Sequence, residues 1–166
     1  MQFPTRATIK KRLLAAKQMF LANDSDLLHG SMSERAMTHK FAEAMQNVFR
    51  SWHVDCEYNR EGKVPKRIDL PEKPNKTVLP DIIVHRRNPD GGQNVSKNLL
   101  VIEAKPSNSD AESVAYDTRK LHAYITGRLG YRYGILLTFV MGNKPDVKFE
   151  IFTPKHPPLK FNSEPQ

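Results

Sequence analysis

Two apolar stretches decide the fold: residues 98–105 read NLLVIEAK, and residues 78–84 read VLPDIIV. Each holds a short, mainly aliphatic run, over 98–102 and 78–84, of the kind found in strands that are buried on both faces. Residues 86–92, RRNPDGG, lie between the two runs and form a strong turn signal. The pattern therefore predicts two buried strands that are neighbours at the centre of a sheet.

The flanking segments carry the periodicities of helices and of further strands. Apolar residues that repeat at three- and four-residue steps predict helices, whereas alternating or continuous apolar runs predict strands. The segment 59–78 is polar, contains prolines and has no sustained period, so we expect a loop or an extended hairpin arm there. The predicted helices span residues 5–22, 32–50 and 113–129, and the remaining strands span 53–58, 133–141 and 147–152.

This order of elements predicts an α/β fold with a mixed central sheet of four to five strands flanked by helices. The 166 residues suit a single domain, since single cores commonly occupy roughly 100–200 residues. Within it we expect an N-terminal helical extension over 1–30, a core over 31–153 and a polar tail over 154–166. The tail carries four prolines and should be poorly ordered unless it docks on the core.

Composition narrows the classes of partner and of site. The formal net charge of +8, with a pI near 9.6, favours polyanionic partners, because lysine and arginine displace counterions from phosphate backbones. The single cysteine, Cys56, excludes an intramolecular disulfide and a cysteine-rich zinc site. No apolar stretch is long enough for a membrane span and no secretory signal is recognisable, so we expect an intracellular, cytoplasmic protein.

Acidic and basic side chains gather at the ends of the two central strands. Asp81 follows Pro80 at the start of one strand, and Glu103 and Lys105 end the other. Because residues two apart in a strand point to the same face, Glu103 and Lys105 should project together, and a hairpin would bring Asp81 beside Glu103. Two adjacent carboxylates repel one another unless a cation lies between them, and oxygen ligands suit Mg²⁺ or Mn²⁺ rather than zinc. The alternative is an exposed strand end with an ordinary ion pair.

The pair Pro80-Asp81, followed by Glu103-Ala104-Lys105, resembles the signature of the PD-(D/E)XK, or restriction-endonuclease-like, nuclease superfamily. The resemblance implies an αβββαβ core and Mg²⁺-dependent hydrolysis of DNA phosphodiester bonds, leaving a 5′-phosphate and a 3′-hydroxyl, with Mn²⁺ able to substitute. It also implies that Asp81, Glu103 and the Ala104 carbonyl bind the metal. Lys105 would then orient or activate the attacking water.

The resemblance in organisation covers residues 31–141. Many members of the superfamily place a glutamate on the first core helix, facing the metal, and Glu34 is the candidate because it lies on the apolar stripe of the predicted helix. The alternative is a capping box from Ser31, in which Glu34 only satisfies a backbone N–H. Glu43 is the fallback, but it lies off the stripe and should be solvated.

Other polar residues are secondary candidates for substrate contact. Asp117 and Lys120 lie on the helix after the motif, where related enzymes often direct polar residues at the metal or the substrate. Their offsets from Leu121 leave the orientation open, and we expect ordinary helix-surface charges at both positions. Arg60, after the first predicted strand, could contact phosphate or only open the basic loop. His39 could approach the edge of the site, although a lone histidine is more often structural.

The sequence thus predicts a metal-dependent nuclease that acts on DNA, as a homodimer if both strands of a duplex are cut. Two other classes stay open. One is a catalytically inactive protein of the same fold that binds nucleic acid or a protein, and the other is an unrelated basic adaptor for a protein partner. The sequence contains no Gly-rich phosphate loop and no nucleophile-elbow motif, which disfavours an NTPase and a Ser-His-Asp hydrolase.

Overall fold

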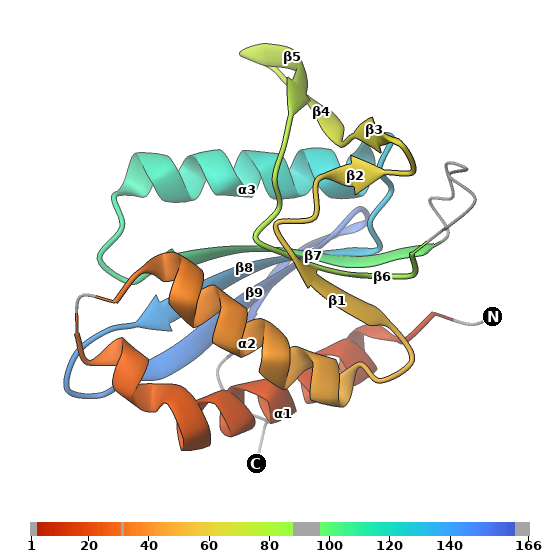
Figure 1. Cartoon of the computed structure of the whole chain (residues 1–166). Helices are drawn as coiled ribbons and strands as arrows, with labels where there is room; N and C mark the ends of the chain where they lie inside the picture. The colour runs from red at the N-terminus through yellow and green to blue at the C-terminus, as the bar shows by residue number, and fades with distance from the viewer. Residues whose placement is uncertain (1–2, 31, 88–96, 162–166) are drawn as a thin grey trace.

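A computed structural model describes residues 3–30, 32–87 and 97–161 of the chain (Figure 1). In these segments the helices are α1 (Arg6–Asp24), α2 (Glu34–Val48) and α3 (Ala111–Thr126), with a short 3-10 helix (Ser25–Leu28) after α1. The main sheet contains β1 (His53–Cys56), β6 (Ile82–His85), β7 (Asn98–Pro106), β8 (Tyr133–Val140), β9 (Asp146–Thr153) and β10 (His156–Phe161). None of the described helices is long and apolar enough to cross a membrane.

The main sheet is mixed, with the strand order β1-β6-β7-β8-β9-β10. β7 and β8 run parallel, and the other neighbouring pairs are antiparallel. A parallel pair needs a crossover connection, which α3 provides. The predicted α/β class with a mixed sheet is therefore confirmed. Within the helices and the main sheet, α2, β1, β6, β7, α3 and β8 follow one another in the predicted order.

The sheet has six strands rather than the predicted four to five, because the C-terminal segment docks on β9 as the edge strand β10. Phe161 is 7% exposed, and its ring stacks on that of Phe149 with centroids 5.3 Å apart. Burial of this ring outweighs the proline content of the segment, and prolines are tolerated where a strand lies at a sheet edge. The tail therefore docks as far as Phe161; residues 162–166 lie outside the described chain.

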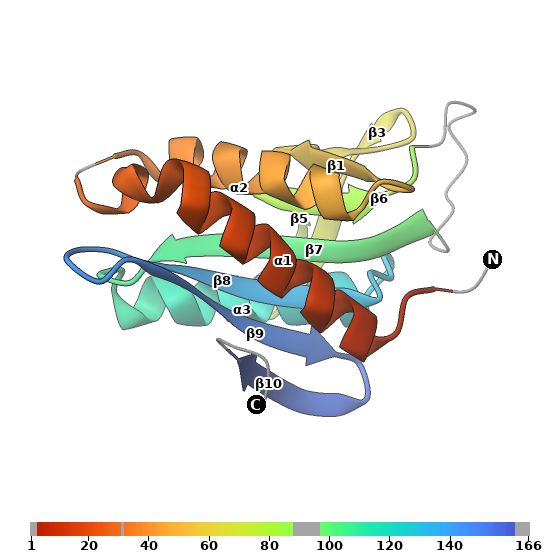
Figure 2. The same cartoon turned by 90° about the horizontal axis from the view of Figure 1, so that it is seen from below.

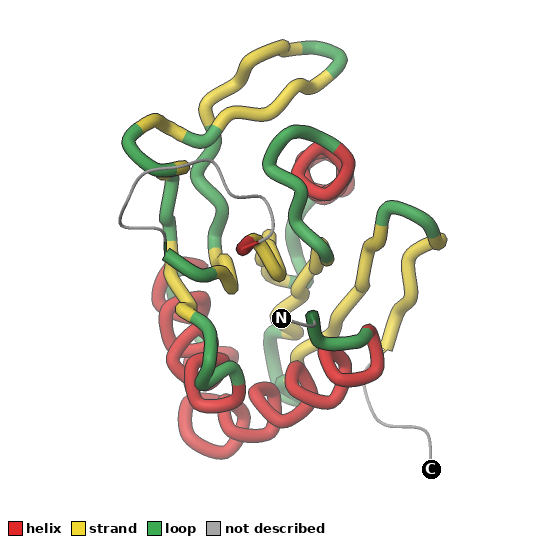
Figure 3. Tube along the Cα trace, turned by 90° about the vertical axis from the view of Figure 1, so that its right-hand side faces the viewer, coloured by secondary structure: helices red, strands yellow, loops and turns green. Residues whose placement is uncertain are grey.

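Helices cover both faces of the sheet (Figure 2). On one face, α1 and α2 pack on the sheet through four aromatic rings, and the centroids of neighbouring rings lie 5.7 to 6.2 Å apart. The rings are those of Phe20 in α1, Phe41 in α2, Phe139 in β8 and Phe149 in β9. α1, which was expected as an N-terminal extension, contributes buried residues to this core. α3 covers the opposite face, as the end-on view shows (Figure 3).

Local hydrogen bonding explains where the elements differ from their predicted bounds. α3 begins two residues before the predicted start, because Asp110 caps it: its Oδ1 accepts from Ser113 N at 2.7 Å. The strand predicted over 78–84 is limited to β6, since Pro80 has no N–H to offer a neighbouring strand. β7 continues past its predicted end because the parallel strand β8 pairs with it as far as Pro106.

The predicted hairpin arm is confirmed within the segment 59–78. It holds two small antiparallel hairpins, and Figure 1 shows the second of them standing out beyond α3. Lys66, between the hairpins, is 2% exposed; its Nζ donates to the carbonyl oxygens of Tyr58 and Arg60, and burial lowers its pKa to about 8. The four strands are β2 (Arg60–Glu61), β3 (Val64–Pro65), β4 (Arg67–Leu70) and β5 (Lys73–Thr77).

Phe41→Ala should lower the free energy of unfolding by about 3–5 kcal/mol, because Phe41 is fully buried among the rings of Phe20, Phe139 and Phe149. Glu43→Ala, at an exposed position of the same helix, is the matched control and should change it by less than about 0.5 kcal/mol. Urea denaturation followed by circular dichroism measures both. A loss below about 1 kcal/mol for Phe41→Ala would contradict the packing of α2 on the sheet.

Candidate active site

The register of β6 against β7 brings the two motif carboxylates together. Ile82 pairs with Ile102, so the next residues along the ladder, Asp81 and Glu103, lie opposite one another. Oδ2 of Asp81 accepts a hydrogen bond of 2.8 Å from the backbone N–H of Ala104. The prediction that a hairpin places Asp81 beside Glu103 is borne out by this geometry.

Glu103 and Lys105 both point to the α3 side of the sheet, as their two-residue spacing predicts. Glu103 Oε2 lies 2.7 Å from Lys120 Nζ, and Lys105 Nζ lies 3.1 Å from Asp117 Oδ2. Asp117 Oδ1 also accepts from Lys120 Nζ at 2.8 Å, so Asp117 links the two lysines. Glu103 is 1% exposed. The alternative of an exposed strand end is therefore wrong.

The structure also corrects the interpretation of Asp117 and Lys120 as ordinary helix-surface charges. Asp117 is 3% exposed, and the Lys120 side chain is 14% exposed. Asp117 lies four residues before the buried Leu121, one turn of helix away, and so shares its face. The four-residue spacing between Asp117 and Leu121 is visible in the sequence, and it could have predicted that Asp117 faces the sheet. Tyr124, which is buried on the same face of α3 near Glu103, was not identified from the sequence. Burial and the charge of Glu103 raise the pKa of Tyr124.

Glu34 reaches the same place from α2. Its Oε1 lies 3.4 Å from Lys105 Nζ, across the end of the sheet from α3. α2 is capped by Ser33, whose Oγ accepts from Ala36 N at 3.2 Å, so Glu34 is the first residue of the helix rather than the third residue after a Ser31 cap. The capping-box alternative is therefore wrong for Glu34, while Ser31 itself lies outside the described residues.

Two of the predicted candidates do not join this group. Glu43, the fallback, is exposed and pairs with Lys40 at 2.9 Å and with His39 at 3.2 Å, as expected of a solvated residue. Arg60 lies on β2, opposite Pro65 of β3, and its side chain is exposed. Among the described residues, no ion pair links the side chain of Arg60 to the motif, so its role in substrate contact stays a prediction.

Acidic and basic groups thus converge at the end of β7, in what we call the carboxylate–lysine cluster. Four carboxylates face two lysines, which leaves two negative charges in excess when all groups are ionised. Burial makes that excess costly, because few water molecules can screen it. The cluster consists of Glu34, Asp81, Glu103, Asp117, Lys105 and Lys120.

Burial and the excess of negative charge shift the pKa values of the cluster. Burial and the charge of Asp81 raise the pKa of Glu103 well above 4.5, against the opposing effect of Lys120. Burial raises the pKa of Asp81 and also that of Glu34. Burial lowers the pKa of Lys105, but the nearby carboxylates outweigh it and hold the pKa above its ordinary value. Lys105 is therefore a cation at neutral pH, and the carboxylates carry the unfavourable charge.

The donor atoms of the cluster fit a hard divalent cation. Glu103 is buried beside the Tyr124 hydroxyl, and its Oε1 makes no hydrogen bond of ordinary geometry; a cation between Glu103 and Asp81 would give the carboxylate a further partner and relieve their repulsion. Carboxylate and carbonyl oxygens are the ligands that Mg²⁺ takes in proteins. Within the described segments, no three Asp, Glu, His or Cys side chains are already gathered as a ligand set. Instead, Glu103 and Asp117 form ion pairs with Lys105 and Lys120.

A cavity of about 580 Å³ opens beside the cluster, between the start of α2 and the end of β1. Glu34 and Asp81 are among the residues that line it, so the cavity is next to two carboxylates of the cluster. His39 lines it too, as its predicted approach to the site edge requires. Cys56 is also in the wall, but burial and the neighbouring acidic groups raise its pKa to about 11. Its thiol is protonated at neutral pH and is a poor nucleophile.

Glu103→Gln should stabilise the protein at pH 8 and have little effect near pH 4.5. A carboxyl group whose pKa is raised on folding binds its proton more tightly in the folded state, so stability falls as the pH rises above its ordinary pKa of 4.5. The amide removes that loss. Thermal denaturation in EDTA at both pH values measures it, with the exposed Glu43→Gln as control. A variant less stable than wild type at pH 8 would show that the ion pair with Lys120 outweighs burial.

The structure places Pro80-Asp81 directly before β6 and Glu103-Ala104-Lys105 in β7, with helices before and after them. No family model, no curated protein and no solved structure matches the chain.

Proposed function

We propose that the protein is a metal-dependent nuclease of the PD-(D/E)XK type, which hydrolyses phosphodiester bonds in DNA. The observation that carries the proposal is the carboxylate–lysine cluster, in which both halves of the motif meet at one end of the central strands. Burial and mutual repulsion of its carboxylates give a divalent cation a reason to bind there. A lysine held beside that position completes the group of side chains that such a hydrolysis needs.

The fold supports the same assignment. The order α2, β1, β6, β7, α3, β8 agrees with the αβββαβ core of the restriction-endonuclease-like fold. Asp81 directly precedes the second strand of that core, and Glu103 and Lys105 lie on the third. β10 and the hairpin arm are additions to that core. Fold-level analogy alone does not establish an activity, so the argument depends on the cluster.

In the proposed mechanism, Asp81, Glu103 and the Ala104 carbonyl would hold Mg²⁺, and Glu34 would complete its surroundings. The ion would supply Lewis-acid stabilisation of negative charge and a more acidic water. Lys105 is fixed as an ammonium group by Asp117 and Glu34. It therefore serves best to orient the water and to stabilise charge on the phosphate, rather than to accept a proton.

Basic groups near the cluster suit the phosphate backbone of DNA. Lys76 of the hairpin arm lies 4.4 Å from the ring centroid of Tyr116 on α3, and Arg119 lies 5.5 Å from the same ring. Lys120 of the cluster lies 5.8 Å from the same ring, which places Lys76 and Arg119 near the site; Arg119 also pairs with Glu72 at 3.3 Å. Phosphate contacts of this kind position a duplex without reading its sequence.

A catalytically inactive module that binds nucleic acid or a protein is the second candidate. It is favoured by the ion pairs within the cluster, because Lys120 already neutralises Glu103 at 2.7 Å and Lys105 already contacts Asp117. A metal must displace part of this arrangement to bind. The two candidates therefore differ in whether Mg²⁺ binds at Asp81 and Glu103.

Lys105→Ala should reduce DNA cleavage by at least about 100-fold, because it removes the cation that stabilises charge at the phosphate. Wild type and the variant would be incubated with supercoiled, linear, branched and single-stranded DNA, each with Mg²⁺, Mn²⁺ or EDTA. EDTA should abolish cleavage by wild type. Lys11→Ala, at an exposed position of α1, removes the same charge elsewhere and should retain activity.

Each other outcome of this assay has a definite meaning. Equal residual cleavage by wild type and Lys105→Ala would indicate a contaminating nuclease. DNA binding without cleavage, together with no Mg²⁺-induced rise in melting temperature, would support the inactive module. DNA binding that is insensitive to metal and unchanged in Asp81→Asn and Glu103→Gln would instead support a basic adaptor.

A further inference from the structure

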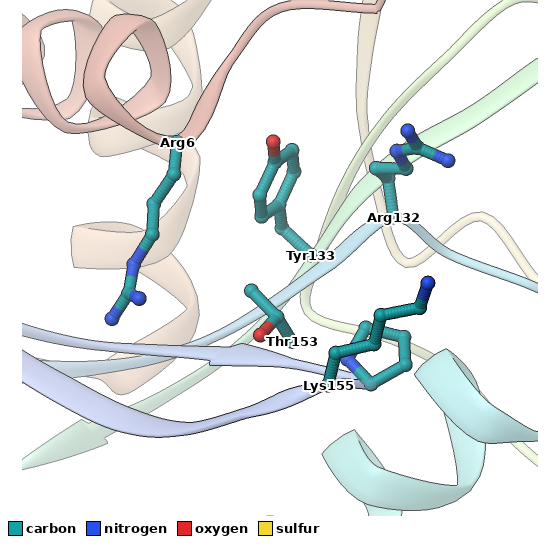
Figure 4. A pocket seen from close by; sticks show the side chains of 6 residues that line it. Arg6, Arg132, Tyr133, Thr153 and Lys155 are labelled. Atoms are coloured by element: carbon teal, nitrogen blue, oxygen red, sulfur yellow. The ribbon is translucent and has the colours of Figure 1, made fainter.

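A second pocket, of about 430 Å³, lies at the other end of the central strands (Figure 4). Its floor is a cross-strand pair: Gly134 pairs with Phe152, so Tyr133 at the start of β8 faces Thr153 at the end of β9. The first turn of α1 and the turn from β9 to β10 supply the walls. The lining residues are Arg6, Arg132, Tyr133, Thr153, Pro154 and Lys155.

This pocket is separate from the carboxylate–lysine cluster. Lys105 pairs with Thr138 of β8, five residues beyond Tyr133, which is roughly 16 Å along a strand at about 3.3 Å per residue. Tyr133 also packs into the core beneath α1 and α2, whereas Glu103 contacts α3 on the opposite face. A small ligand in the pocket would therefore not reach the cluster.

Three cationic side chains and no acidic one line the pocket: Arg6, Arg132 and Lys155. Across the described residues, the ion pairs include none of these three. Lys105 and Lys120, by contrast, each contact two carboxylates. The pocket thus carries a concentrated positive charge that an anion would neutralise.

Two polar atoms of the pocket residues are buried and have no hydrogen-bond partner: Nε of Arg6 and Oγ1 of Thr153. Buried polar atoms are normally paired, so each such atom calls for a partner that the chain does not supply. The Arg6 nitrogen is a donor, and the Thr153 hydroxyl can donate as well. An anionic oxygen satisfies donors of both kinds.

The surrounding contacts hold the pocket in shape before any ligand binds. Tyr133 is 8% exposed, and its hydroxyl donates to the carbonyl of Pro4 at 3.0 Å, which anchors the segment that leads into α1. The guanidinium of Arg132 lies 5.2 Å from the ring centroid of Phe3 in that segment. Figure 4 shows Arg6 on one side of the Tyr133 ring, and Arg132 and Lys155 on the other. The three cationic side chains therefore lie on both sides of the Tyr133 ring.

We propose that this pocket binds a small phosphate-bearing ligand of the mononucleotide class. Its volume of about 430 Å³ falls within the roughly 300–1,000 Å³ of small-molecule sites. A phosphate group has the charge and the acceptor oxygens to bind cationic side chains such as those of Arg132 and Lys155, which lie on the same side of the Tyr133 ring (Figure 4). The span of the cations across Tyr133 favours a ligand larger than a single free phosphate. The proposal does not rest on the nuclease function.

Isothermal titration calorimetry in EDTA tests it, with deoxyadenosine 5′-monophosphate, pyrophosphate and deoxyadenosine as probes. The nucleotide should bind wild type, and its Kd should rise at least about tenfold in Arg132→Ala and in Lys155→Ala. Both side chains are exposed, so their removal should leave the fold intact, which circular dichroism checks. Thr153→Val keeps the shape but removes the hydroxyl, and should weaken binding as well.

Two controls separate a specific pocket from general attraction to a basic protein. Lys148→Ala, at an exposed position of β9 on the α3 face, removes one charge outside the pocket and should leave Kd unchanged. Glu103→Gln alters the carboxylate–lysine cluster and should leave Kd unchanged too. Because no cleavage is measured and no metal is present, the result is independent of the nuclease assay.

The proposal is overturned if the nucleotide and pyrophosphate both fail to bind at millimolar concentration. Equal affinity for deoxyadenosine would overturn it too, since recognition would then not involve phosphate. Equal weakening by Lys148→Ala and Lys155→Ala would show non-specific electrostatics, and loss of binding in Glu103→Gln would place the ligand at the cluster. Pyrophosphate binding as tight as that of the nucleotide would overturn the mononucleotide class, because the base and the sugar would then add nothing to recognition.

Discussion

The hydrogen bond from the Ala104 N–H to Asp81 Oδ2, 2.8 Å long, ties the start of β6 to the end of β7. It fixes the register in which Asp81 lies opposite Glu103, and every contact of the carboxylate–lysine cluster depends on that register. A slip of one residue would turn Glu103 and Lys105 toward the core beneath α1 and α2. The apolar residues that alternate between the two cores prevent this, because the slip would exchange both sets of buried side chains.

The same register produces the electrostatic strain of the site. Four carboxylates and two lysines are held together by a rigid sheet and two helices, so they cannot separate to relieve their repulsion. The folded state therefore carries an unfavourable excess of negative charge at this position. The pocket at the other end of the strands has the opposite sign, since arginine and lysine lie there without acidic partners among the described residues. The two ends of one sheet thus carry charged groups of opposite sign.

Much of this arrangement could be predicted from local patterns. The apolar runs beside Asp81 and Glu103 predicted adjacent buried strands, and the two-residue spacing placed Glu103 and Lys105 on one face. The predictions failed where the structure of a segment depends on contacts that the local pattern does not show. The final strand forms because Phe161 finds the ring of Phe149, and Glu34 is freed from a capping role because Ser33 caps α2 instead.

What the sequence alone determined is the class of fold and the centre of the site, because strand and helix periodicities and the short PD and ExK spacings are local properties of the chain. Only the tertiary structure decided that Asp117 and Lys120 are buried beside Glu103, since a helix pattern does not specify what its face meets. It also gathered Arg6, Arg132 and Lys155, which are far apart along the chain, around one pocket. Such groupings depend on long-range packing, of which the local sequence carries no record.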